Sequence, residues 1–363
     1  TNMNTPIGTT IIVASRSLCL IVIFLFTCFG QKLFAQEGLS SITIKETKAH
    51  KFRKTVPPGN YSGLTRLGGE HYAVVDDKSK SDGFWLFTIK IDSITGEILN
   101  VKADTFISSH QPNRDGEGIA FVPSKNTLFI SGEAPSEIKE YYLDGRITGQ
   151  GLHLPKKMRQ CRNNYSYESL TYDKLRNCLW TVSESTLKED GACATSTNHT
   201  INHLRLQCYD PQSGNLIAQY PYAMEAPTVE KAAYLYILGV SELLALENGH
   251  LLVLEREVFV PKKRVGAFAR CKLFEVDVTQ SNQINESVSL SNDTVSFLPK
   301  KLVWEKTTHI NLFRQDFANY EGMTLGPRLK DGRQTILLCS DSQNGQSGIL
   351  RDWFLSLIIE PQK

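Results

Sequence analysis

Apolar and polar residues alternate in short runs along most of this 363-residue chain. A period of two predicts β-strands that bury one face in a sheet. Clear runs occur at residues 84–91, 138–143, 204–209, 272–278 and 353–359. Turn-forming pairs such as Thr95-Gly96 and Asp144-Gly145 separate neighbouring runs. The pattern therefore predicts an all-β fold of short strands.

A short motif repeats along these strands. It has a polar position, then Glu or Ser, then a small and an apolar residue, and it is found at residues 61–64, 116–119, 167–170, 241–244 and 320–323. Each copy precedes an apolar strand that ends in an acid, at residues 71–77, 128–133, 179–184, 251–255 and 336–341. The copies are 55, 51, 74 and 79 residues apart, which is the spacing of repeated structural units.

Each unit contains enough strands for one blade of a β-propeller. Fourth strands are expected at residues 98–106, near Leu152, at 216–220 and at 302–304. The last unit lacks one, and residues 41–46 from the other end of the chain are expected to complete it and close the ring. We predict five four-stranded antiparallel blades. A sixth stays open if a longer spacing conceals a degenerate unit, and a sandwich or barrel would explain the strands but not the repeated acid.

The first 35 residues resemble a secretory signal. Arg16 precedes an apolar run at residues 18–29, and cleavage is expected after Ala35. An uncleaved anchor and, more weakly, a lipoprotein at Cys28 are the alternatives. The propeller domain would then span residues 36–363 as a monomer. It would have no integral membrane segment and would be secreted, periplasmic or at the cell surface.

Charge and cysteine content narrow the function classes. Lys and Arg number 40 against 38 Asp and Glu, and the two counts become equal once Arg16 and Lys32 leave with the signal. A neutral body gives no general attraction to nucleic acid, so no nucleic-acid partner is expected. Six cysteines follow the signal, and both three disulfides and buried free thiols remain open.

The repeated acids are the candidate functional residues. The first strand of each propeller blade lines the central channel, so Glu117, Glu168, Glu242 and Glu321 are expected to converge there. Acids at the ends of the next strands would join them: Asp76 or Asp77, Glu133, Glu184, Glu255 and Asp341. Crowded carboxylates repel, so they need protonation, a basic partner or a cation. Oxygen ligands favour Ca²⁺ or Mg²⁺ over zinc.

Two further features bear on these acids. A Glu at a strand start is also suited to accept backbone N–H bonds from the next blade, which would make it structural. Arg162 and Arg256 are expected to neutralise an acid or to bind a substrate phosphate. The chain contains no G-x-S-x-G, HExxH, P-loop or dinucleotide motif, which argues against those catalytic classes.

Five segments together resemble the phytase-like domain family described as having esterase-like activity. They are residues 61–64 with 75–77, 115–119, 162–170 with Glu184, 239–246 with 254–256, and 319–323 with 340–341. The resemblance implies hydrolysis of phosphate esters and an acidic set of Glu117, Glu168, Glu184, Glu242, Glu255, Glu321 and Asp341. Ser342 stands where a second acid or Asn is expected, which puts a ligand at that position in doubt.

We therefore expect an exported hydrolase that uses Ca²⁺, or Mg²⁺, to cleave a small phosphate ester in the propeller mouth. The expected catalytic residues are Glu168, Glu184, Arg162 and Arg256. The expected metal ligands are Glu117, Glu168, Glu242, Glu255, Glu321 and Asp341. The alternative is a non-catalytic propeller that binds a ligand or protein and whose acids are structural.

Overall fold

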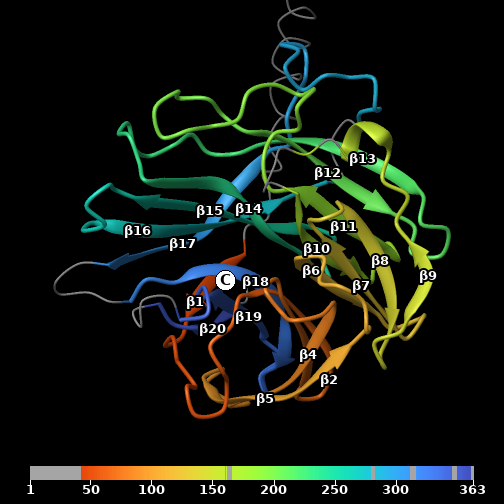
Figure 1. Cartoon of the computed structure of the whole chain (residues 1–363), viewed down its shortest axis with the longest axis vertical. Coiled ribbons are helices and arrows are strands. Elements are labelled where there is room, and N and C mark those ends of the chain that lie inside the picture. The colour runs from red at the N-terminus through yellow and green to blue at the C-terminus, as the bar shows by residue number, and fades with distance from the viewer. Residues whose placement is uncertain are drawn as a thin grey trace, which may run out of the picture. The chain divides into compact units, whose positions relative to one another are not determined.

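Five four-stranded antiparallel sheets form the computed structural model of this protein (Figure 1). The structure describes residues 42–159, 161, 166–278, 283–310, 316–345 and 350–360. The expected signal segment and Arg162 lie outside these ranges. The prediction of an all-β propeller with five four-stranded blades is confirmed.

The strands follow the chain blade by blade, with a single short 3-10 helix, η1 (Lys156–Arg159), among the described residues. Blades 1 and 2 contain β2 (Tyr61–Gly68), β3 (His71–Asp76), β4 (Gly83–Ile91), β5 (Ile98–Ser108), and β6 (Gly116–Val122), β7 (Thr127–Gly132), β8 (Glu137–Tyr142), β9 (Ile147–Gly151). Blades 3 and 4 contain β10 (Tyr167–Asp173), β11 (Cys178–Ser183), β12 (His203–Tyr209), β13 (Leu216–Ala223), and β14 (Leu235–Ala245), β15 (Leu251–Val260), β16 (Ala267–Val276), β17 (Lys300–Ile310). Blade 5 contains β18 (Asn319–Arg328), β19 (Gln334–Asp341), β20 (Phe354–Glu360) and β1 (Thr43–Glu46).

The two ends of the propeller domain meet in blade 5. Strand β1 pairs antiparallel with β20, with Thr43 opposite Glu360 and Glu46 opposite Leu357. The first strand of the domain thus becomes the outer strand of the last blade, as the sequence predicts. This pairing joins distant parts of the chain and protects the edge of β20.

The inner strands β2, β6, β10, β14 and β18 contact one another in that order, and β18 returns to β2. Apolar side chains from adjoining sheets fill the space between blades, as Trp180 and Leu243 do between blades 3 and 4. Hydrogen bonds also join the inner strands. Ser62 Oγ donates to the Gly116 carbonyl at 2.9 Å, and Ser241 Oγ donates to the Tyr320 carbonyl at 3.2 Å. The first strand of each blade therefore lines the shared axis.

Cys178, Cys193, Cys208, Cys271 and Cys339 are free thiols, and all of them except Cys193 are buried. This outcome matches the second of the two alternatives that the sequence leaves open. Among the described residues, no helix has the length and apolar character needed to cross a membrane.

Candidate functional site

Each inner strand has a β-bulge at the repeated motif. The pairing to the second strand of the blade skips one or two residues at this point in all five blades. The skipped residues include Ser62, Glu117, Glu168, Ser241 and Glu321, which we call the bulge ring. A bulge turns its side chain out of the regular alternation, and bulges often occur beside active sites.

A second set of equivalent positions lies at the ends of the second strands. In each blade, the residue just before the bulge pairs with a residue on the second strand. The next residue after that partner belongs to this second set. They are Asp77, Glu133, Glu184, Arg256 and Asp341, which we call the strand-end ring. Four blades supply an acid at this position, and blade 4 supplies an arginine.

Arg256 joins the two rings. Its Nη2 donates to Glu184 Oε1 at 2.8 Å and to Glu168 Oε2 at 2.9 Å, while its Nη1 contacts Glu321. The side chains of Arg256 and Glu184 are 5% and 2% exposed, whereas Glu168 and Glu321 are 16% and 12% exposed. Solvent therefore reaches the cluster from the side of the bulge ring.

The two rings hold more negative than positive charge. Seven carboxylates occupy the rings, against the guanidinium of Arg256 and the ammonium of Lys78, which pairs with Asp77 at 2.9 Å. Burial raises the pKa of Glu117, Glu168 and Asp341 well above the ordinary range, and repulsion from neighbouring carboxylates raises it further. The same causes raise the pKa of Glu321 to about 7, although Arg256 opposes them.

The neighbouring carboxylates also shift the pKa of Arg256. Burial alone would lower the pKa of this guanidinium, but Glu168, Glu321 and Glu184 outweigh burial and raise its pKa well above the ordinary value. The arginine is therefore a permanent cation that holds three carboxylates in place.

Two acids predicted for the site lie elsewhere. Glu242 is fully buried and accepts hydrogen bonds from the backbone N–H of Leu170 at 2.9 Å and of Leu243 at 3.0 Å. Glu255 contacts Tyr222 Oη at 2.6 Å and Lys300 Nζ at 2.7 Å, away from Arg256. In blade 4 the skipped residue is Ser241, so Glu242 and Glu255 are each one residue out of step with the rings.

Two acids of the strand-end ring, Asp77 and Glu133, are absent from the catalytic residues and metal ligands expected from the sequence. A tyrosine precedes the bulge residue in blades 1, 3 and 5, and Val240 takes this place in blade 4. When the blades are aligned on this residue instead of on Glu, Ser241 takes the bulge-ring position of blade 4 and Arg256 takes its strand-end-ring position. That alignment is the signal in the sequence that identifies both rings.

The donor chemistry of the rings fits a hard divalent cation. The donors are carboxylate oxygens in excess, and Asp77 Oδ1 is buried without a hydrogen-bond donor among the described residues. Within the same ranges, no group of three or more His, Cys, Asp or Glu is already arranged as a metal site. Three of the glutamates contact Arg256 instead. A cation would therefore be held by acids outside the contacts of Arg256, namely Asp77, Glu117 and Asp341.

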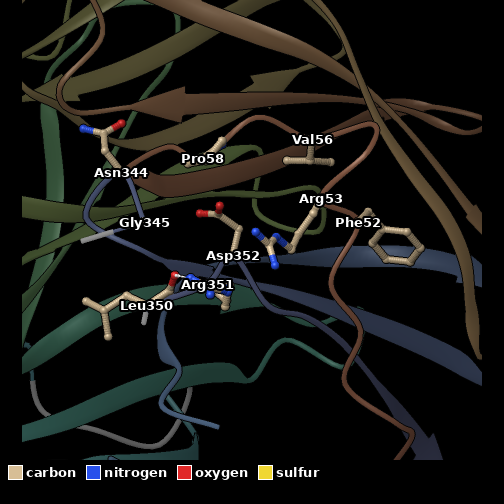
Figure 2. A pocket seen from close by; sticks show the side chains of 9 residues that line it. All are labelled: Phe52, Arg53, Val56, Pro58, Asn344, Gly345, Leu350, Arg351 and Asp352. Carbon is tan, nitrogen blue, oxygen red and sulfur yellow. Dashed lines mark hydrogen bonds between the residues drawn. The ribbon is translucent and has the colours of Figure 1, made fainter. Parts of the chain in front are cut away.

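A cavity of about 320 Å³ lies next to the strand-end ring, between blades 1 and 5 (Figure 2). Arg53, Arg351 and Asp352 line it together. Asn344, which lines the cavity, lies three residues after Asp341 of the strand-end ring. Burial raises the pKa of Asp352 to about 6.

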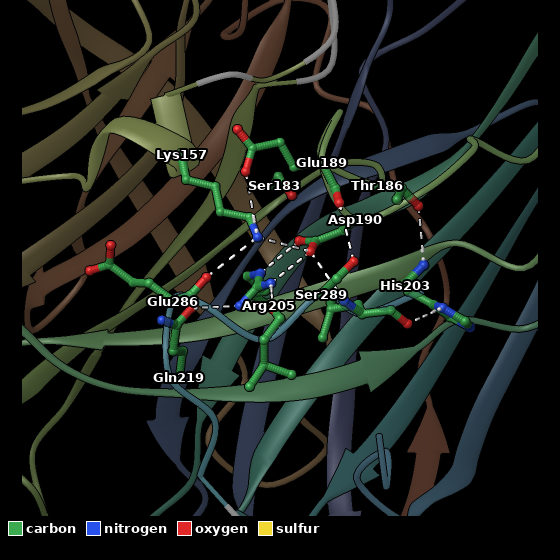
Figure 3. Close-up of polar contacts among 12 residues, drawn as sticks. Lys157, Ser183, Thr186, Glu189, Asp190, His203, Arg205, Gln219, Glu286 and Ser289 are labelled. Atoms are coloured by element: carbon green, nitrogen blue, oxygen red, sulfur yellow. Dashed lines mark hydrogen bonds and ion pairs between the residues drawn. The ribbon is translucent and has the colours of Figure 1, made fainter. Parts of the chain in front are cut away.

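The loop that joins β11 to β12 meets the loop that joins β16 to β17 beside blade 3 (Figure 3). Asp190, in the loop that follows Glu184, forms a bidentate pair with Arg205 on β12, with both distances 2.6 Å. The loop between β16 and β17 contacts the same pair, since the backbone N–H of Leu290 donates to Asp190 Oδ1 at 3.2 Å. The loop after Glu184 is thus tied to its blade by a buried ion pair.

The sequence of this chain matches the model of a known protein family. A model of the family described as phytase-like, with esterase-like activity of phytase, matches residues 56–343. The chain matches none of the curated proteins. Similar solved structures include an endo-arabinase from Bacteroides thetaiotaomicron, with 8% identity over 87% of this chain and 99% of that chain and a TM-score of 0.44. They also include a streptogramin B lyase, with 10% identity over 87% of this chain and 98% of that chain and a TM-score of 0.37.

Proposed function

Because the chain belongs to the phytase-like family described by the esterase-like activity of phytase, we propose that it hydrolyses phosphate esters at the two rings around Arg256. The observation that supports this proposal is the gathering of seven carboxylates from four blades around one arginine. Family membership supports the hydrolysis of phosphate esters, and the negative charge of the rings supports a divalent cation as cofactor.

The negative charge of the rings makes a cation part of this proposal. A phosphate ester is an anion, and the surplus carboxylates would repel it. We assign Ca²⁺, or Mg²⁺, to Asp77, Glu117 and Asp341. When bound, such a cation neutralises phosphate oxygens and lowers the pKa of a coordinated water. The other ring residues then act on a substrate that the net charge no longer excludes.

Glu321 is the best-suited proton acceptor. Its pKa of about 7 lies near neutral pH, where a general base is most effective, and its side chain is partly exposed. Arg256 is a positioning residue, because its contacts to Glu168, Glu184 and Glu321 fix the directions of these carboxylates. In the sequence-based expectation Arg162 also binds phosphate, and this residue lies outside the described ranges.

A second function is favoured by the burial of Arg256. A guanidinium paired with three carboxylates is also what a structural junction between blades requires. On this alternative the propeller binds a cation or another ligand at the rings without turnover.

The apolar run at residues 18–29 supports export under either function, so we propose that the protein acts outside the cytoplasm.

The test of the proposed function is hydrolysis of 4-nitrophenyl phosphate and bis(4-nitrophenyl) phosphate by the full chain, with CaCl₂ or MgCl₂ and with excess EDTA. We expect activity that needs the cation and that falls about 100-fold or more in Glu168→Gln combined with Glu321→Gln, because positioned acid–base groups contribute rate factors of this size. Glu247→Gln is the matched control, since Glu247 is 66% exposed and pairs with Arg328 away from the rings.

Two results would contradict the mechanism. Activity that persists in EDTA would show that hydrolysis needs no cation. Activity that survives the double substitution would show that the carboxylates of Glu168 and Glu321 are not needed. A complete lack of hydrolysis, together with cation binding, would favour the second function.

A further inference from the structure

A cavity of about 450 Å³ lies beside the loop that joins β3 to β4. One wall is aromatic and consists of Trp85 on β4 and Phe106 on β5, two neighbouring strands of blade 1 (Figure 1). The loop supplies the other wall through Lys78, Lys80 and two serines. Its volume falls in the range of sites that hold small molecules.

The aromatic wall is built by the register of the sheet. Trp85 and Phe106 are cross-strand partners, and their rings meet edge to face with centroids 5.5 Å apart at 70°. Both side chains are only partly buried, so ring surface remains open toward the cavity. A fixed pair of this kind offers a planar ligand a preformed contact with little loss of side-chain entropy.

One residue links this cavity to the acidic rings. Lys78 lines the cavity, and its Nζ lies 2.9 Å from Asp77 Oδ2 of the strand-end ring and 3.6 Å from Asp115. Asp76, another lining residue, directly precedes Asp77. Lys78 thus connects the cavity with Asp77 of the strand-end ring.

The charges of the cavity also differ from those of the rings. Lys80 is exposed, and it takes part in none of the ion pairs found within the described ranges, whereas Lys78 is paired. An unpaired ammonium beside an aromatic wall attracts a ligand that is both planar and negatively charged. Phosphate esters of ring-bearing alcohols have both properties.

We propose that this cavity is the subsite for the alcohol portion of the substrate and that it selects phosphate esters whose alcohol carries an aromatic ring. The inference rests on the proposed function of the rings. The phosphate group would face the rings, and the aromatic ring would lie against Trp85 and Phe106.

The test compares 2-phenylethyl phosphate with butyl phosphate. Both esters release simple alkyl alcohols of similar reactivity, so a difference in rate reports on binding rather than on the leaving group. We expect kcat/KM for the phenylethyl ester to exceed that for the butyl ester by about tenfold, which corresponds to one favourable aromatic contact. Trp85→Leu should abolish this preference, mainly through KM, while the rate with butyl phosphate changes by less than about twofold.

The control is Tyr234→Leu, which removes an aromatic side chain that is 67% exposed on another blade and should leave the preference intact. The second readout is calorimetric binding of the two corresponding phosphonates, which are not hydrolysed. A preference that Trp85→Leu leaves unchanged, in rate and in binding, would overturn the subsite while the hydrolase remains. Lack of hydrolysis with phosphonate binding that depends on Trp85 would overturn the hydrolase and uphold the aromatic site.

Discussion

Arg256 takes the place of an acid that the other four blades share. Its planar guanidinium donates in several directions at once, which lets one residue bind carboxylates from blades 3 and 5. A lysine at this position would carry the same charge but would lack a planar group whose N–H donors point in several fixed directions. The side chain therefore both lowers the repulsion within the rings and fixes their geometry.

Replacing this arginine should expose the repulsion it suppresses. For Arg256→Gln in the absence of divalent cations, we expect a loss of about 3–5 kcal/mol in the free energy of unfolding near pH 8. The loss should be smaller at about pH 5, because the raised pKa values of Glu168 and Glu321 let these acids protonate and lose their charge. Urea unfolding at both pH values measures the difference. Arg333→Gln, on a surface pair with Glu360, should cost little, and an equal loss in both variants would contradict the role of Arg256.

At the scale of the strand, the β-bulge decides which glutamates belong to the site. Glu117 is skipped by the pairing of β6 and faces other ring acids, whereas Glu242 stays in register on β14 and binds backbone N–H groups. Gly118 at the bulge of β6 shows how closely blades 2 and 3 approach there, since a Cβ atom at this position would lie 2.6 Å from the Glu168 carbonyl oxygen. Two glutamates in similar sequence contexts thus have different surroundings.

These surroundings predict opposite effects of the same substitution. Burial raises the pKa of Glu242 well above its ordinary value, so its contribution to stability is greatest at low pH and is lost as the pH rises through the folded-state pKa. Glu242→Gln should therefore stabilise the protein near pH 8, less so at about pH 5, and leave its response to Ca²⁺ unchanged. Glu117→Gln should weaken the response to Ca²⁺. Thermal unfolding with and without CaCl₂ separates the two, and a weaker response in Glu242→Gln would show that the ring assignment is wrong.

The same distinction explains what the sequence could and could not predict. Period-two alternation and turn pairs located the strands, and the unmatched last unit located the closing strand β1, because these features depend on local pattern. The fourth strand expected near Leu152 is the short β9, which ends at Gly151. A bulge adds a residue to one strand only, so the shift in blade 4 that separates Ser241 from Glu242 depends on the pairing partner, and its one trace in the sequence is the apolar Val240 before Ser241.

For the whole propeller, the rings connect all five blades at one end of the inner strands. Closure by β1 holds the blades together, and the carboxylates oppose closure by mutual repulsion. A cation bound by Asp77, Glu117 and Asp341 would link blades 1, 2 and 5 and relieve that repulsion. The raised pKa values imply that this repulsion grows as the pH rises and the acids ionise.

The melting temperature of the full chain in EGTA and in millimolar CaCl₂, at about pH 5 and about pH 8 with ionic strength matched by NaCl, tests the central claim most directly. A ligand that binds only the folded state raises its stability, so CaCl₂ should raise the melting temperature, and more so near pH 8, where the acids are ionised. In EGTA the protein should melt at a lower temperature near pH 8 than at pH 5. Equal melting temperatures in EGTA and CaCl₂ near pH 8 would contradict a cation site built from the two rings.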